Sequence, residues 1–209
     1  MSPAESAAVF ANRTAFAEPC TGTANTFPDR LAREARAALA TLGWEVGGAV
    51  GPAFTRRAVV AGASSAAFYV HSHGDHYLDP QTGVRSSGFR VDGGFCTNAP
   101  KVIASQIVAQ RGTAAPMTLA VVSTCHNGER ASKLPAAFGI AMRKTAPGAS
   151  GPRSFYLGYV GISWIRAAAR FERTFWSGLR EGAATGVAFE HALLAGFDPS
   201  DLSPEWWGS

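Results

Sequence analysis

Two short apolar runs in this chain end abruptly in reactive polar residues, and this pattern limits what the chain can fold into. The run 68–70 leads directly into His71-Ser72-His73-Gly74-Asp75-His76. The run 117–122 leads into Ser123-Thr124-Cys125-His126-Asn127-Gly128. Short apolar runs bounded by turn residues are typical of buried strands, and in open α/β sheets the chemistry lies just past the carboxyl ends of such strands. We therefore expect one strand to present a histidine and a neighbouring strand to present a cysteine.

The rest of the chain alternates between strand and helix patterns. Strands are expected at 7–11, 44–46, 66–70, 117–122 and 155–160, and helices at 30–42, 56–63, 101–111, 133–143, 165–179 and 185–194. Short polar side chains that cap helices well stand at four of the expected helix starts, namely Asp29, Thr55, Asn98 and Ser132. This alternation predicts an α/β fold with a mostly parallel sheet covered on both faces. We see no repeat and no boundary, so residues 1–209 are expected to form a single domain.

Three further segments carry expectations of their own. Residues 78–97 are rich in Gly, Asp and Ser and are expected to form a long functional loop. The tail ends in Trp206-Trp207, which should dock on the body of the protein because paired exposed tryptophans are costly to solvate. In the helix 165–179 the aromatic residues are expected to form a packed face, with Glu172 on the opposite, polar side.

Charge and cysteine usage exclude several classes of protein. The net charge of +4 is mild and the basic residues are scattered, so no nucleic-acid partner is expected. No apolar window reaches the ~18 residues that a membrane span requires, and the N-terminus lacks a basic-then-apolar leader. Cys20, Cys96 and Cys125 are odd in number and widely spaced, which argues against a disulfide framework and a CxxC zinc site. We expect a reducing, cytoplasmic setting, with Cys20 and Cys96 as packing or surface thiols.

Cys125 and His73 are suited to nucleophilic catalysis. The attacking species of a cysteine hydrolase is the thiolate, and a free cysteine is only a few per cent ionised at neutral pH. A nearby imidazole can take the proton and later protonate a leaving amine. The two residues end strands separated by one crossover helix, so we expect those strands to be adjacent or nearly so. The backbone amides of Gly74 and Cys125 are expected to face a developing oxyanion.

The same residues carry a resemblance to a known group of enzymes. An apolar strand followed by His73-Gly74, then an apolar strand followed by Cys125, resembles the caspase–gingipain clan of cysteine peptidases. The segment 123–128 is similar to the cysteine block of metacaspases. The later blocks 134–138, 156–159 and 168–176 resemble bacterial caspase-like CHAT domains. The resemblance implies a caspase-like three-layer αβα fold and endopeptidase action on protein or peptide substrates, with His73 as acid/base, Cys125 as nucleophile and no cofactor or metal.

The chain departs from the metacaspase pattern in the expected substrate pocket. Metacaspase-like sequences that cleave after Arg or Lys usually carry an aspartate two residues before the cysteine, and here that position is Ser123. We assign Ser123 to substrate binding without a basic preference. Asp75 and Asp92 are the acidic residues available to such a pocket, and Asp75 is the one we assign to it.

Two alternative hypotheses remain open from the sequence. The stretch 71–76 also matches HxHxDH, a motif with which metallo-β-lactamase-fold hydrolases hold zinc. Against this hypothesis, only His126 and His191 remain downstream as further ligands. The other alternative is an inert caspase-like interaction module, since fold does not dictate function. Of the remaining histidines, His71 and His126 are expected to shape their loops, and His191 to lie on a helix surface.

Overall fold

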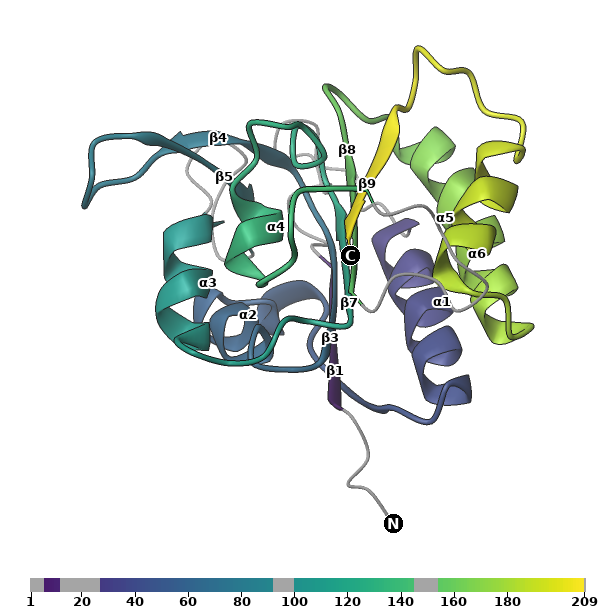
Figure 1. The fold of residues 1–209 in the computed structure, drawn as a ribbon, viewed down its shortest axis with the longest axis horizontal. Helices are drawn as coiled ribbons and strands as arrows, with labels where there is room; N and C mark the ends of the chain where they lie inside the picture. Colours follow the sequence, from purple (N-terminus) through teal and green to yellow (C-terminus); the bar gives the residue numbers. More distant parts are fainter. Residues whose placement is uncertain (1–5, 12–26, 92–99, 145–153, 209) are drawn as a thin grey trace.

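A six-stranded sheet runs through the middle of the molecule and separates two layers of helices (Figure 1). The computed structural model describes residues 6–11, 27–91, 100–144 and 154–208. The strands of the sheet are β1 (Ser6–Ala11), β2 (Glu45–Gly47), β3 (Ala67–His71), β7 (Leu119–Ser123), β8 (Phe155–Tyr159) and β9 (Pro204–Gly208). They lie in the order β2-β1-β3-β7-β8-β9, and all neighbours are parallel except β8 and β9.

Helices cover both faces of this sheet. One face carries α1 (Phe27–Thr41), α5 (Ile165–Arg180) and α6 (Thr185–Leu193). The other face carries α2 (Arg56–Gly62), α3 (Ala104–Arg111) and α4 (Leu134–Ala137), preceded by the short 3-10 turn η1 (Gly51–Ala53). The predicted three-layer αβα fold with a mostly parallel sheet is therefore confirmed. Among the described residues, no helix is both long and apolar enough to cross a membrane.

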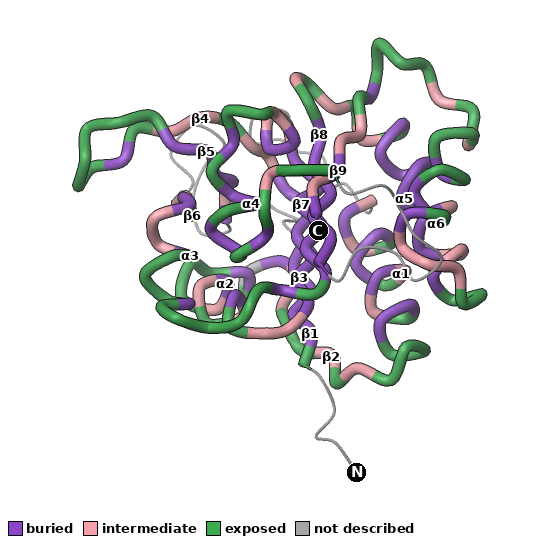
Figure 2. The backbone as a smooth tube through the Cα atoms, viewed as in Figure 1, coloured by how far each residue is buried: buried purple, intermediate pink, exposed green. Residues whose placement is uncertain are grey.

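Alternate residues of each strand supply the two halves of the core. Tyr69 of β3 packs edge-on against Trp176 of α5, with ring centroids 5.6 Å apart. Its neighbour Phe68 points to the opposite face and packs against Phe138, at 5.1 Å. The strands are buried along most of their length, whereas the outer surfaces of the helices are exposed (Figure 2). Because both faces of the sheet are covered, the strands read as continuous apolar runs, as the sequence indicated.

A second, antiparallel sheet lies beside the first and was missed by the sequence analysis. It contains β4 (Gly74–Leu78), β5 (Arg85–Arg90) and β6 (Lys101–Ile103), in the order β4-β5-β6. The expected loop 78–97 is thus wrong in part, because residues 85–90 pair with β4. The expected helix 101–111 is also wrong at its start, since its first three residues pair with β5. The Gln106 side chain accepts a hydrogen bond from the Ile103 N–H at 3.1 Å, which marks the change from strand to helix.

Several helix boundaries differ from the expectations. Helix α1 begins at Phe27, so Asp29 lies inside the first turn, where an acidic side chain suits the helix dipole. Helix α4 has a single turn, because Gly139 adopts a φ of 75° directly after Phe138. The Thr55 cap of α2 is confirmed, since its hydroxyl accepts from the Ala58 N–H at 3.2 Å. Asn98 lies outside the described residues.

The tryptophan tail docks on the body of the protein, as expected, but it does so as a strand. Residues 204–208 form β9, which pairs with β8 at the edge of the sheet. Trp206 stacks on Phe155 with an interplanar angle of 10° and centroids 5.3 Å apart. The prediction of a packed aromatic face on α5 is confirmed, because Phe171, Phe175 and Trp176 are fully buried.

Candidate active site

The carboxyl ends of β3 and β7 lie side by side, as the sequence pattern predicted. The two strands pair in parallel with His71 opposite Ser123, and the Ser72 N–H donates to the Ser123 carbonyl at 3.3 Å. His73 and Cys125 each follow this matched pair by two residues. The equal offset brings the predicted acid/base and the predicted nucleophile to the same end of two adjacent strands.

Gly74 keeps the histidine segment in direct contact with the cysteine loop. A Cβ atom placed on Gly74 would lie 2.6 Å from Oγ1 of Thr124 and 2.5 Å from Nδ2 of Asn127. It would lie closer still to the carbonyl oxygen of Cys125. Because any side chain would overlap these atoms, only glycine permits this approach of the two backbones.

The amide of Gly74 is directed away from the second sheet. The Arg90 N–H donates to the carbonyl of His73 at 2.9 Å, which makes these two residues a hydrogen-bonded position of the antiparallel pair. The next pair, Gly74 and Phe89, therefore occupies a non-hydrogen-bonded position, whose amides point outward from the ladder. This orientation makes the Gly74 N–H available to a group outside the β4–β5 ladder.

The loop that carries the cysteine is fixed from two sides. The Asn127 side chain is fully buried, and its Nδ2 donates to the carbonyl of Gly88 on β5 at 2.8 Å. The hydroxyl of Tyr156 donates to the Asn127 carbonyl at 2.8 Å, and the Gly128 N–H donates to the carbonyl of Tyr159 at 2.8 Å. Contacts with β5 and with β8 thus hold residues 124–128 in one position relative to both sheets.

The thiol of Cys125 is half-buried and contacts Ser163. The Ser163 N–H donates to Sγ at 3.4 Å, and the Ser163 hydroxyl lies 3.5 Å from Sγ. Ser163 directly precedes Trp164, the N-cap of the 16-residue helix α5. The thiol therefore faces the positive end of a long helix dipole. Ser163 was not among the residues expected at the site, although a serine just before a helix start and just after a buried strand is a recognisable signal.

Glu129 lies between two histidines at the edge of the same site. Its Oε2 accepts from Nε2 of His76 at 2.9 Å and its Oε1 accepts from Nδ1 of His126 at 2.7 Å. The Gly161 N–H also donates to Oε1, at 3.3 Å. Partial burial raises the pKa of the Glu129 carboxyl, but the hydrogen bonds from both histidines and Gly161 outweigh this effect and leave it below its ordinary value. Within the described residues these three side chains form a group whose ligand atoms all lie within 4.8 Å of one another.

A buried hydrogen-bonded chain lies beneath the two strand ends. Glu172 is fully buried and accepts from the hydroxyls of Tyr69 (2.7 Å), Tyr159 (2.6 Å) and Ser123. The Ser123 hydroxyl in turn accepts from Nδ1 of His71 at 2.6 Å. Burial, with a smaller contribution from the hydroxyl donors in the opposite direction, raises the pKa of Glu172. Burial and the nearby His73 lower the pKa of His71 to about 3.

The buried hydrogen-bonded chain of His71, Ser123 and Glu172 corrects three expectations. Ser123 is buried and bonded to His71 and Glu172, so its side chain does not contact a substrate directly. Glu172 lies on the sheet-facing side of α5, not on its polar side, because Tyr69, Tyr159 and Ser123 together satisfy its oxygens. His71 is the last residue of β3 and not a loop residue.

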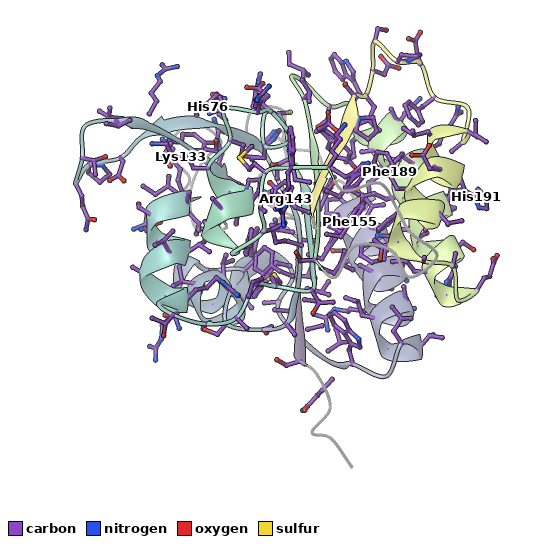
Figure 3. The ribbon with its side chains drawn as sticks, in the orientation of Figure 1. His76, Lys133, Arg143, Phe155, Phe189 and His191 are labelled. Carbon is purple, nitrogen blue, oxygen red and sulfur yellow. The ribbon has the colours of Figure 1, made fainter. Side chains whose placement is uncertain are left out.

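The residues of the HxHxDH stretch do not share a single ligand set. His71 points into the core toward Ser123, whereas His76 lies on β4, where it is labelled in Figure 3, and bonds Glu129. Asp75 is exposed, and its carboxylate accepts from the N–H of His76 at 2.7 Å. His191 is exposed on α6, as expected (Figure 3). The predictions for Cys20, Cys96 and Asp92 lie outside the described residues.

Comparison with known proteins supports the fold without assigning a function. No protein-family profile and no curated protein matches the sequence. The fold is similar to that of the solved protein GSU0716 from Geobacter sulfurreducens, with a TM-score of 0.58 and 15% sequence identity. This likeness covers 98% of this chain and 92% of that chain. At this identity it shows a shared fold and nothing about chemistry.

Proposed function

We propose that this chain is a caspase-like cysteine endopeptidase domain that hydrolyses peptide bonds through His73 and Cys125. The observation that carries the proposal is the strand register, which offsets both residues equally from the paired residues His71 and Ser123. The contact between Gly74 and the Cys125 loop supports it, because it holds the backbone of the histidine segment beside the backbone of the cysteine loop. The odd, widely spaced cysteines and the free thiol of Cys125 fit a reducing, cytoplasmic setting.

The proposed reaction has two steps. The Cys125 thiolate attacks the carbonyl carbon of the scissile peptide bond, and the amides of Gly74 and Cys125 donate to the oxyanion that forms. His73, which holds the thiol proton, gives it to the amine as the carbon–nitrogen bond breaks, leaving a thioester on Cys125. Water then attacks the thioester with His73 as base, which releases the carboxylic acid and restores the thiol. Before attack, the Ser163 N–H donates a hydrogen bond to Sγ at 3.4 Å.

The surroundings of the thiol favour an apolar substrate residue. Ile162 and Trp164 flank Ser163, and these residues are 63% and 59% exposed. Large apolar side chains with this exposure beside a reactive group are typical of a binding surface. Asp75 is exposed on β4 and remains the candidate for an acidic contact with the substrate. We propose that the two apolar side chains contact the peptide near the cleaved bond.

The test is peptide hydrolysis measured beside covalent labelling of the thiol. Purified protein is assayed against a library of fluorogenic peptides, and Cys125→Ala and His73→Asn should each lower hydrolysis by about 10³-fold or more. Iodoacetamide should label Cys125, as located by mass spectrometry, and abolish hydrolysis. Cys96→Ser and His191→Asn are the matched controls and should retain full activity.

Two results would overturn the proposal. If hydrolysis persists in Cys125→Ala, the thiol is not the nucleophile. If a chelator abolishes hydrolysis while alkylation does not, the chemistry depends on a metal and not on the thiol. A folded protein that labels at Cys125 yet cleaves no peptide or protein substrate would support the interaction-module hypothesis in its place.

A further inference from the structure

We propose that His76, His126 and Glu129 form a binding site for one divalent cation of the zinc class, adjacent to but separate from the His73/Cys125 pair. The three side chains come from two segments, β4 and the loop after β7, that the fold brings together. Each offers one ligand atom, namely Nε2 of His76, Nδ1 of His126 and a carboxylate oxygen of Glu129. Neither segment has the ligand set by itself, so the site exists only in the folded chain.

The spacing of the ligand atoms fits a tetrahedral ion after a small adjustment. Zinc bonds to His nitrogen and carboxylate oxygen of about 2.0–2.1 Å place neighbouring ligand atoms about 3.3 Å apart. The two nitrogens now lie 2.9 and 2.7 Å from the Glu129 oxygens, which are hydrogen-bond distances. These two contacts must expand by about half an ångström, and the widest pair of ligand atoms, which lies within 4.8 Å, must contract toward the same spacing. Side-chain rotation can supply both changes, since all three side chains are only half-buried.

The ring of His76 already has the partner that a metal-bound imidazole needs. Its Nδ1 lies 3.2 Å from the hydroxyl of Ser87, a fully buried side chain on β5. A histidine that binds a metal through Nε2 carries its proton on Nδ1 and donates it to a nearby oxygen. The Ser87 hydroxyl can accept this proton, because a hydroxyl serves as donor or acceptor.

The backbone conformation of His126 also holds its ring beside Glu129. Its φ is 61°, which makes His126 the one non-glycine residue in the left-handed region among those described. Such a conformation costs free energy and persists only where the surrounding structure imposes it. Its N–H donates to the Gly161 carbonyl at 2.8 Å, and the Gly161 N–H donates back to Glu129 at 3.3 Å. The ring centroids of His76 and His126 lie 5.9 Å apart, so the two rings flank the carboxylate.

The ligand types select the ion. Imidazole nitrogens suit zinc, cobalt, nickel and copper, whereas calcium and magnesium prefer oxygen ligands. Three protein ligands leave a fourth tetrahedral position open to water. This set shares only His76 with the HxHxDH hypothesis, and it draws its other two ligands from the cysteine loop.

The experiment measures metal binding in protein that lacks the thiol. Cys125→Ser protein is stripped with a chelator and titrated with Zn²⁺ by calorimetry and with Co²⁺ by visible absorption. We expect one ion per chain and a tetrahedral cobalt spectrum. Glu129→Gln and His126→Asn, each in this background, should weaken binding at least tenfold. Asn tolerates a positive φ, so His126→Asn removes the imidazole while keeping the backbone.

Matched variants separate a site from general surface binding. Glu190→Gln and His191→Asn remove an exposed carboxylate and an exposed imidazole from α6, and should leave affinity unchanged. In Figure 3, His191 is labelled on the opposite side of the central sheet from His76. Ser87→Ala should weaken binding about tenfold while Zn²⁺ still binds, as removal of an outer hydrogen bond does. The proposal is overturned if the Cys125→Ser protein binds no Zn²⁺ or Co²⁺, or if Glu129→Gln and His126→Asn bind as tightly as their parent. Since the assay uses neither thiol nor substrate, its failure leaves the peptidase proposal untouched.

Discussion

Replacing Gly74 by alanine tests whether the contact between the two loops positions the reacting groups. The added Cβ would lie 2.5 Å from Nδ2 of Asn127 and 2.6 Å from Oγ1 of Thr124, and closer still to the Cys125 carbonyl. Ordinary van der Waals contact begins at about 3.4 Å or more, so the two backbones must separate by nearly 1 Å. The neighbours cannot yield instead, because Asn127 is fully buried and bonded to Gly88.

The expected effects on stability and on activity differ in size. Overpacking of this kind costs about 1–3 kcal/mol of unfolding free energy. For a chain of this length that corresponds to a fall in Tm of about 2–4 °C per kcal/mol. A displacement near 1 Å at a reacting centre costs about 10²-fold in rate. We therefore expect Gly74→Ala to remain folded at 25 °C and to lose about 10²-fold in peptide hydrolysis.

Thermal unfolding and hydrolysis of the best library peptide measure the two effects side by side. Gly47→Ala is the matched control, because a Cβ there meets only the Ala7 carbonyl, at 3.9 Å. That variant should change neither Tm nor activity appreciably. If Gly74→Ala keeps both its Tm and its activity, the close contact does not position the site and the reasoning from glycine geometry is refuted.

Three further predictions concern the exposed Trp164 and the buried, hydrogen-bonded His71 and Glu172. Trp164→Ala should raise KM for apolar peptides about tenfold with kcat nearly unchanged, because part of a large apolar surface no longer contacts the substrate. Stability should fall as the pH drops from 6.5 toward 3, by about 1.4 kcal/mol per unit, because the unfolded chain protonates His71 near pH 6.5 while the folded chain holds its pKa at about 3. In urea titrations at a series of pH values, the His71→Asn protein should not show this pH dependence of the unfolding free energy. The contribution of Glu172 to the pH dependence of stability has the opposite sign. Because its pKa is raised in the folded chain, stability should fall as pH rises above about 4.5, and Glu172→Gln should remove that fall.

The layers and most elements could be predicted from the sequence because they depend on local pattern. Apolar runs such as 67–71 and 119–123 are continuous because both faces of their sheet are covered, and the helix 165–180 shows a strong apolar face. The adjacency of β3 and β7 followed from the single crossover helix between them. These inferences depend only on residues that are close together in the sequence.

The parts that sequence analysis missed depend on contacts across the fold. Residues 85–90 are mostly polar or glycine, and they form a strand because β4 and β6 pair with both of its edges. The ligand cluster joins His76 to Glu129 over a long sequence separation, and no spacing rule connects them. Ser163 contacts Cys125 for the same reason, since the meeting of α5 with the cysteine loop is a tertiary event.

Helix α5 links these contacts, and this explains why a carboxylate lies in its buried face. The residue just before its N-cap, Ser163, contacts the thiol of Cys125, while Glu172 in its middle bonds Ser123, two residues before that thiol. A helix fixed at both points cannot slide along the sheet without breaking one of them. Burying a carboxyl without partners would cost several kcal/mol, but three hydroxyl donors offset this cost. Glu172 therefore sets the register of α5 against β7, and through that register it sets the position of Ser163 at the sulfur.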